Sequence, residues 1–194
     1  MMEKDPISEE IKVPKEVSEK FKELKDKLDK FREELLKKFD KYIIGIALVP
    51  PEIIDPEDAK FIPKDELEKK QNSLRILVLV DDTDSKDVNQ FSLRDKLFDV
   101  VEKMSKTIDP NIKPDVLLNS ELVENCYDAK YEILRTIAMS VVIYDPKDLL
   151  AAVRISEVHK SMTIKKFQRY ILSYVAAGSL FRGEKSNDID VYIV

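Results

Sequence analysis

Two aspartates near the end of this 194-residue sequence have the spacing of a divalent-cation site. Asp188 and Asp190 flank Ile189 and open an apolar run, Val191 to Val194, that is typical of a β-strand. Side chains alternate between the faces of a strand, so we expect both carboxylates on one face and Ile189 in the core. Two neighbouring carboxylates repel each other unless a cation lies between them, and this pattern therefore indicates a metal site.

A Gly-Ser pair precedes these aspartates. An apolar run from Tyr174 to Ala177 leads into Gly178 and Ser179. Free backbone N–H groups and a small hydroxyl suit a phosphate. Arg182 and Lys185, in the same loop, can add positive charge to that phosphate, although loop side chains of this kind are more often simply solvated.

The whole pattern, G-S-x3-G-x4-D-x-D between strand-like runs, resembles the signature of the nucleotidyltransferase superfamily. This superfamily has the fold of DNA polymerase beta and includes many small archaeal and bacterial proteins. The resemblance implies transfer of a nucleoside monophosphate from a nucleoside triphosphate, such as ATP, to a hydroxyl. It implies that Asp188 and Asp190 are catalytic and hold two Mg²⁺ ions, and that Gly178 and Ser179 hold phosphates. The alternative is a β-hairpin whose turn happens to contain Gly, Ser and Asp.

The resemblance also implies a third carboxylate on a later strand, and none follows Val194. We therefore expect this chain to be the N-terminal part of an enzyme, or to complete its site with another chain. A non-catalytic, antitoxin-like module that binds a nucleotide or a protein is one alternative. An RNA-binding unit is another, and its basic helix face would consist of Lys160, Lys165, Lys166 and Arg169. The acceptor, whether RNA, protein or small molecule, stays open.

Upstream, apolar strands alternate with amphipathic helices, which indicates an α/β fold. Apolar residues at three- and four-residue steps predict a long helix over Lys15–Lys41, after a loose tail of residues 1–14. The predicted strands are Ile43–Val49, Leu74–Val80, Lys113–Leu118 and Val141–Tyr144. Further helices are predicted at Lys64–Lys70, Ser92–Lys106, Glu121–Cys126, Ala129–Ala138, Lys147–Val158 and Thr163–Ser173. We expect a nucleotidyltransferase-like mixed sheet with packed helices over residues 15–150, with Leu74–Val80 buried on both faces.

An internal repeat accompanies this pattern. Lys37 to Ile44 matches Lys165 to Leu172, with both segments reading K-K-F-x-[KR]-Y-I-[IL]. We interpret the chain as a tandem repeat in which residues 151–194 hold a linker helix and the first hairpin of a second unit. The alternative is coincidence between two helix-to-strand transitions.

The first copy of this repeat lacks the motif. Pro50-Pro51, which has no backbone N–H to offer a phosphate, stands in place of Gly-Ser. Leu74 and Ile76 stand in place of the aspartates, while Asp115 lies roughly where a third acid would fall. We therefore expect no catalytic metal in the first copy.

Composition limits the function classes. A net charge of −5 argues against bulk electrostatic binding of nucleic acid. The single cysteine, Cys126, excludes an internal disulfide and fits a reducing, cytoplasmic compartment. We expect Cys126 to be a small buried residue. The single histidine, His159, is expected at a solvated helix position. No apolar run approaches the length that spans a membrane. A charged fraction of 37% with few Asn and Gln suggests a thermophile.

The terminal strand predicts the assembly state. Without the strands that normally flank it, the run from Asp188 to Val194 would leave an apolar edge exposed. We therefore expect docking on the first copy's sheet or pairing with another chain, and a homo-oligomer or a missing C-terminal half rather than a stable monomer.

Overall fold

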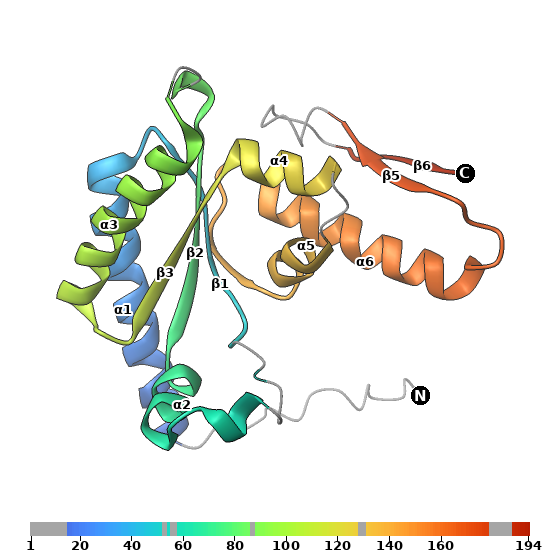
Figure 1. Ribbon diagram of the computed structural model, residues 1–194. Coiled ribbons are helices and arrows are strands. Elements are labelled where there is room, and N and C mark those ends of the chain that lie inside the picture. Colours follow the sequence, from blue (N-terminus) through green and yellow to red (C-terminus); the bar gives the residue numbers. More distant parts are fainter. Residues whose placement is uncertain (1–14, 52–53, 55–57, 86–87, 128–130, 179–187) are drawn as a thin grey trace, which may run out of the picture.

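The computed structural model describes residues 15–51, 54, 58–85, 88–127, 131–178 and 188–194 (Figure 1). It is a mixed α/β structure with one four-stranded sheet, helices on both faces of that sheet, and a separate two-stranded sheet at the C-terminal end. The expected fold class is therefore confirmed. None of the helices in these ranges has the length and apolar character needed to cross a lipid bilayer.

The four-stranded sheet is mixed. Its strands are β1 (Ile43–Leu48), β2 (Leu74–Val80), β3 (Ile112–Leu118) and β4 (Val141–Tyr144), in the order β3-β2-β1-β4. Strand β1 runs antiparallel to both β2 and β4, whereas β2 and β3 are parallel. Strands β2, β3 and β4 therefore end at the same edge of the sheet. All four strands lie where the sequence predicts them, within one residue.

Two layers of helices bury the two faces of β2. Helices α1 (Lys15–Phe39) and α3 (Gln90–Ile108) pack on the face that carries Ile76 and Val78. The opposite face, with Leu77 and Leu79, packs against α4 (Asn119–Tyr127), α5 (Tyr131–Ala138) and α6 (Leu149–Phe167). Short elements α2 (Lys64–Gln71), η1 (Asp58–Phe61) and η2 (Thr83–Ser85) complete the described chain. The sequence of β2 is almost continuously apolar because alternate residues pack into the hydrophobic cores on opposite faces of the sheet.

Helix α6 differs from the prediction. The sequence predicts two helices, Lys147–Val158 and Thr163–Ser173, but the structure has one helix from Leu149 to Phe167. No proline or glycine interrupts that stretch, so nothing ends the helix there. The N-terminal half of α6 buries Leu149, Leu150 and Val153 in the second core, and the domain boundary proposed at residue 150 therefore falls inside this helix.

The C-terminal hairpin forms its own small sheet. Strands β5 (Tyr174–Ala177) and β6 (Asp190–Ile193) pair antiparallel with each other and not with the four-stranded sheet. The hairpin runs beside α6 (Figure 1). Of the two outcomes expected for this hairpin, docking on the sheet of the first copy is therefore wrong, and pairing with another chain stays a prediction. All four residues of β6 are exposed.

The two halves of the proposed repeat share an element order. Helix α1 ends at Phe39 and α6 at the matching Phe167, and each helix is followed by an antiparallel strand pair. Leu48 and Ala176 both lie nine residues after those phenylalanines, and they pair with Ile76 and Val191.

This register corrects the alignment by one residue. Since Val191 matches Ile76, Asp190 matches Arg75 and Asp188 matches Ser73. The sequence alignment had instead paired the aspartates with Leu74 and Ile76. Neither Ser73 nor Arg75 is a carboxylate, so the first copy still lacks metal ligands at these two positions.

Candidate functional site

The terminal hairpin brings the predicted glycine and one predicted aspartate together. Ala177 pairs with Asp190, and Gly178 follows at the end of β5 with a φ of +129°. A side chain is strained in that conformation, so glycine is the residue that fits. A Cβ placed on Gly178 would lie 3.8 Å from the Asp190 Oδ2 and 3.8 Å from its backbone N. The side of Gly178 on which other residues carry a side chain therefore faces the Asp190 carboxylate.

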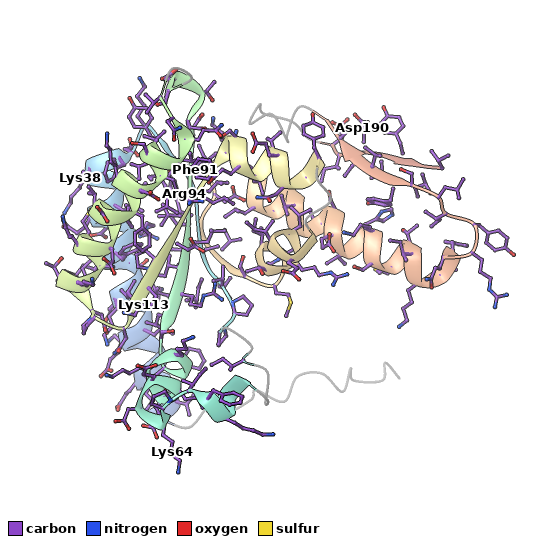
Figure 2. The ribbon with its side chains drawn as sticks, viewed as in Figure 1. Lys38, Lys64, Phe91, Arg94, Lys113 and Asp190 are labelled. Carbon is purple, nitrogen blue, oxygen red and sulfur yellow. The ribbon has the colours of Figure 1, made fainter. Side chains whose placement is uncertain are left out.

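The two aspartates are accessible. Asp188 and Asp190 are both exposed, whereas Ile189 between them is half-buried. This alternation agrees with the expectation that the carboxylates share one side, although only Asp190 belongs to β6. Figure 2 shows Asp190 on the hairpin, away from the four-stranded sheet. Exposed carboxylates can take a cation that keeps several of its waters, as Mg²⁺ does.

Three predicted phosphate-binding residues lie outside the described residues. They are Ser179, Arg182 and Lys185, so Gly178 alone represents that part of the site. Within the described ranges, no group of three or more His, Cys, Asp or Glu side chains is placed to hold a metal ion. The described part of the site thus consists of Gly178 and two exposed carboxylates.

A tyrosine and a histidine that the sequence analysis did not connect hold the hairpin on α6. The Tyr174 hydroxyl lies 2.8 Å from Nδ1 of His159 and donates to the Ser156 carbonyl at 3.4 Å. Burial raises the pKa of Tyr174, and the nearby charge of Glu157 raises it further. The phenol therefore stays protonated, and able to donate, over the neutral range. His159 is exposed on α6, as the sequence predicts, and in addition contacts Tyr174.

The pairing of the hairpin continues past β5. The Ser173 N–H donates to the Val194 carbonyl at 3.0 Å, and the Val194 N–H donates back to the Ser173 carbonyl at 3.0 Å. The Leu172 N–H also donates to the Val194 carbonyl, at 2.6 Å. These bonds fix the open end of the hairpin, and with it the register that places Asp190 opposite Ala177.

A second polar region lies at the edge where β2, β3 and β4 end. Asp81 accepts a hydrogen bond from the Thr83 N–H at 3.1 Å and lies 3.7 Å from the Lys147 ammonium. Burial acts to raise the pKa of Asp81, but the Thr83 hydrogen bonds and the charge of Lys147 outweigh it and hold the pKa below its usual value. Asp145, at the end of β4, accepts from the Ala151 N–H at 2.9 Å and so caps α6, and burial raises its pKa.

One of the four residues of the basic face proposed for RNA binding, Lys160, is largely buried. Lys160 forms an ion pair with the buried Glu157, and only 14% of its side chain is exposed. Lys165, Lys166 and Arg169 are exposed at the end of α6. Cys126 is exposed on α4, so the expectation of a buried thiol is wrong.

A scan against protein-family models, a search of curated proteins and a search of solved structures found no match to this chain. The case for a function therefore rests on the residues and geometry given above.

Proposed function

We propose that this chain is a metal-dependent nucleotidyltransferase module, and that the terminal hairpin binds a nucleoside triphosphate with Mg²⁺. The observation that carries the proposal is the register of β5 and β6, which places Gly178, with its positive φ, beside the Asp190 carboxylate. Backbone N–H groups at a glycine turn bind phosphate oxygens, and a pair of carboxylates binds the cation that accompanies them. The hairpin thus combines both halves of a metal–phosphate site.

Each residue has a separate role in this proposal. Asp188 and Asp190 would hold Mg²⁺, which would supply positive charge to the triphosphate. Gly178 lets the phosphates approach the backbone because no side chain stands in the way. Ser179, Arg182 and Lys185, which lie outside the described residues, would add a hydroxyl and positive charge. Activation of the acceptor hydroxyl needs a further carboxylate, so the hairpin accounts for nucleotide binding rather than for the whole reaction.

Thermal melts test nucleotide binding. A ligand that binds only the folded state raises its stability by mass action, by about 2.7 kcal/mol at a hundredfold excess over Kd. We expect Mg²⁺ with ATP, or with another nucleoside triphosphate, to raise the melting temperature of the native chain. The variant Asp188→Asn/Asp190→Asn should show no such rise, and without metal it should be as stable as the native chain or slightly more so, since it removes the repulsion between the carboxylates.

A matched control separates this site from general charge effects. Asp95→Asn/Asp99→Asn removes two exposed carboxylates from α3 and changes the net charge by the same amount as Asp188→Asn/Asp190→Asn. It should respond to Mg²⁺ and ATP as the native chain does. Equal responses in all three proteins, or none in the native chain, would contradict the proposal.

Turnover distinguishes an enzyme from a non-catalytic module. The exposed carboxylate pair with its glycine turn is equally suited to binding a nucleotide without transfer. Release of pyrophosphate as the nucleoside monophosphate passes to a hydroxyl acceptor or to water, dependent on Mg²⁺ and on Asp188 and Asp190, would support the enzyme. A nucleotide-dependent rise in melting temperature without pyrophosphate release would support the binding module.

A further inference from the structure

The carboxyl ends of the parallel strands β2 and β3 lie side by side, and the chain segments that follow them go to opposite faces of the sheet. After β2 the chain enters α3, on the face covered by α1, and after β3 it enters α4, on the face covered by α6. Adjacent parallel strands with diverging connections leave a crevice outside their carboxyl ends, and open α/β sheets bind ligands there. This edge is the far end of β2 from Ser73 and Arg75, roughly 20 Å along the strand.

Two hollows lie side by side in this crevice. A polar hollow of about 320 Å³ is lined by the loops that follow β2 and β3, including Asp82 and Asn119. An apolar hollow of about 210 Å³ lies between the end of α1 and the start of α3. Ser85, in η2, lines both hollows. Together they have the size of a small-molecule site, which is about 300–1,000 Å³.

The polar hollow has an acceptor, Asp82, that hydrogen bonds hold in place. Asp82 accepts hydrogen bonds from the Ser120 N–H at 3.1 Å and from the Ser120 hydroxyl. The Gln90 amide donates to that same hydroxyl at 3.0 Å, which closes a chain of contacts across the hollow. The Oδ1 atom of Asn119 is buried without a hydrogen-bond partner in the described part of the chain, although other atoms of this residue line the hollow. A buried acceptor without a donor costs stability, and a turn of the Asn119 side chain toward a ligand that donates a hydrogen bond would remove that cost.

The charges in the polar hollow favour a neutral ligand. Asp82 is a carboxylate, and none of the described residues that line this hollow carries a positive charge. Among the described lining residues, the Asp82 carboxylate thus acts against a phosphate. Vicinal hydroxyls, by contrast, can donate to a carboxylate and to an amide oxygen at the same time, as a ribose does to an acidic residue in dinucleotide-binding folds.

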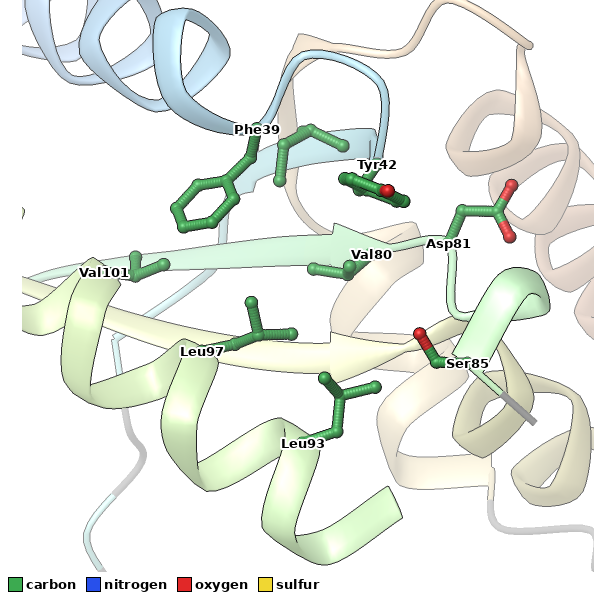
Figure 3. Close-up of a pocket in the computed structure, with 9 residues that line it drawn as sticks. Phe39, Tyr42, Val80, Asp81, Ser85, Leu93, Leu97 and Val101 are labelled. Carbon is green, nitrogen blue, oxygen red and sulfur yellow. The ribbon is translucent and has the colours of Figure 1, made fainter. Parts of the chain in front are cut away.

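The apolar hollow suits a flat ring. Figure 3 shows Phe39 and Tyr42 on one side of the end of β2, and Leu93 and Leu97 on the other. Aromatic and aliphatic walls of this kind bury a ring by apolar contact and by offset stacking.

We propose that this crevice binds a neutral nucleoside, with the ribose hydroxyls on Asp82 and Asn119 and the base in the hollow lined by Phe39 and Tyr42. The site is separate from the terminal hairpin and does not depend on the function proposed for it.

Calorimetric titration of the whole 194-residue chain with adenosine tests the proposal. We expect saturable binding, and at least about tenfold weaker binding of 2′,3′-dideoxyadenosine, which lacks both hydroxyl donors. Ribose alone should also bind at least about tenfold more weakly, because it leaves the apolar hollow unfilled. The absence of saturation up to about 10 mM adenosine, or equal binding of adenosine and its dideoxy analogue, would overturn the proposal.

Variants locate the binding. Asn119→Ala removes the orphan acceptor and should weaken adenosine binding by about tenfold. Leu97→Phe fills the apolar hollow and should weaken it similarly, and Gln90→Ala serves as a second polar variant if either change impairs folding. Asp84→Asn, in the same turn but outside the lining of both hollows, should bind adenosine normally. Asp188→Asn/Asp190→Asn should also bind normally, and a loss of binding there, or unchanged binding in Asn119→Ala, would refute this location.

Discussion

Nδ1 of His159 lies 2.8 Å from the hydroxyl of Tyr174, and this contact joins the terminal hairpin to helix α6. The two rings are tilted by 45° with their centroids 5.7 Å apart. The same hydroxyl also reaches the Ser156 carbonyl. Since β6 is exposed throughout, the placement of the hairpin on the helix depends strongly on this one phenol.

Tyr174→Phe should loosen the hairpin. The change deletes the hydroxyl while keeping the ring, so we expect a loss of about 0.5–1.5 kcal/mol in the free energy of unfolding. Amide hydrogen exchange should show faster exchange in β5 and β6, with little change in the four-stranded sheet. Tyr192→Phe is the matched control because that exposed side chain lies on the same hairpin. Equal effects of the two changes would show that the His159 contact does not hold the hairpin.

Gly178→Ala should strain the backbone at the end of β5. Its φ of +129° is one that side chains rarely adopt, and the strain is worth about 1–3 kcal/mol. We expect a lower melting temperature for the hairpin and a smaller stabilisation by Mg²⁺ and ATP. Ala177→Gly, at the preceding strand residue, is the control and should preserve the response to Mg²⁺ and ATP. If Gly178→Ala responds as strongly as the native chain, Gly178 has no part in phosphate binding.

The ion pair between Lys27 and Asp109 should make stability depend on pH. The Lys27 ammonium lies 2.7 Å from Asp109, whose side chain is buried. The hydrogen bond from Lys27, followed by that from the Asn111 N–H, lowers the pKa of Asp109. The unfolded chain therefore binds this proton more readily, so the stabilisation is full above the ordinary carboxyl pKa and disappears as the pH falls through the lowered value.

Asp109→Asn tests that dependence. It should reduce the free energy of unfolding at pH 7 by up to about 1 kcal/mol, and the difference should shrink as the pH falls below the ordinary carboxyl pKa and through the lowered pKa of Asp109. Urea denaturation across this range measures it. Asp115→Asn, an exposed carboxylate on β3, should change stability little. A deficit in Asp109→Asn that persists unchanged in acid would point to lost packing rather than to lost charge.

Gly45→Ala should disturb the contact between β1 and α6. A Cβ on Gly45 would lie 2.9 Å from Cδ1 of Leu150 and 3.3 Å from Cβ of Leu79. Overpacking of this kind costs about 1–3 kcal/mol. Adding Leu150→Val should recover part of that loss, because it shortens the side chain that the new methyl group would meet, and a double-mutant cycle measures the coupling. Additive effects would show that the two residues do not compete for the same space.

Local patterns account for what the sequence predicts well. The strands of the main sheet are short apolar runs bounded by turn residues, and β2 reads as doubly buried because it is central. The sequence places the end of this helix too late because Ile164, Phe167 and Ile171 have helical spacing, whereas the backbone of Leu172 and Ser173 pairs with Val194. A local pattern cannot show such a tertiary preference.

One of the two candidate sites can be identified from a local sequence pattern, and the other cannot. Gly178 and Asp190 belong to one short sequence motif, so the motif alone identifies them. The crevice could not be found in this manner, because Asp82 and Ser120 meet across 38 positions of sequence through the parallel pairing of β2 and β3. The one-residue shift in the repeat alignment has a similar origin, since only strand pairing fixes which residues oppose each other.

The position of the hairpin around the axis of α6 depends on the number of residues in that helix. Its first turns are embedded in the core through Leu150 and Val153, and His159, further along, carries the hairpin. One residue inserted between Val153 and His159 would turn the hairpin about 100° around the helix axis and move it about 1.5 Å along that axis. Seven inserted residues, close to two full turns, would return it to nearly the same side of the helix at a distance about 10 Å greater. The direction in which Asp190 faces is thus set by the number of residues in a helix that contains no part of the motif.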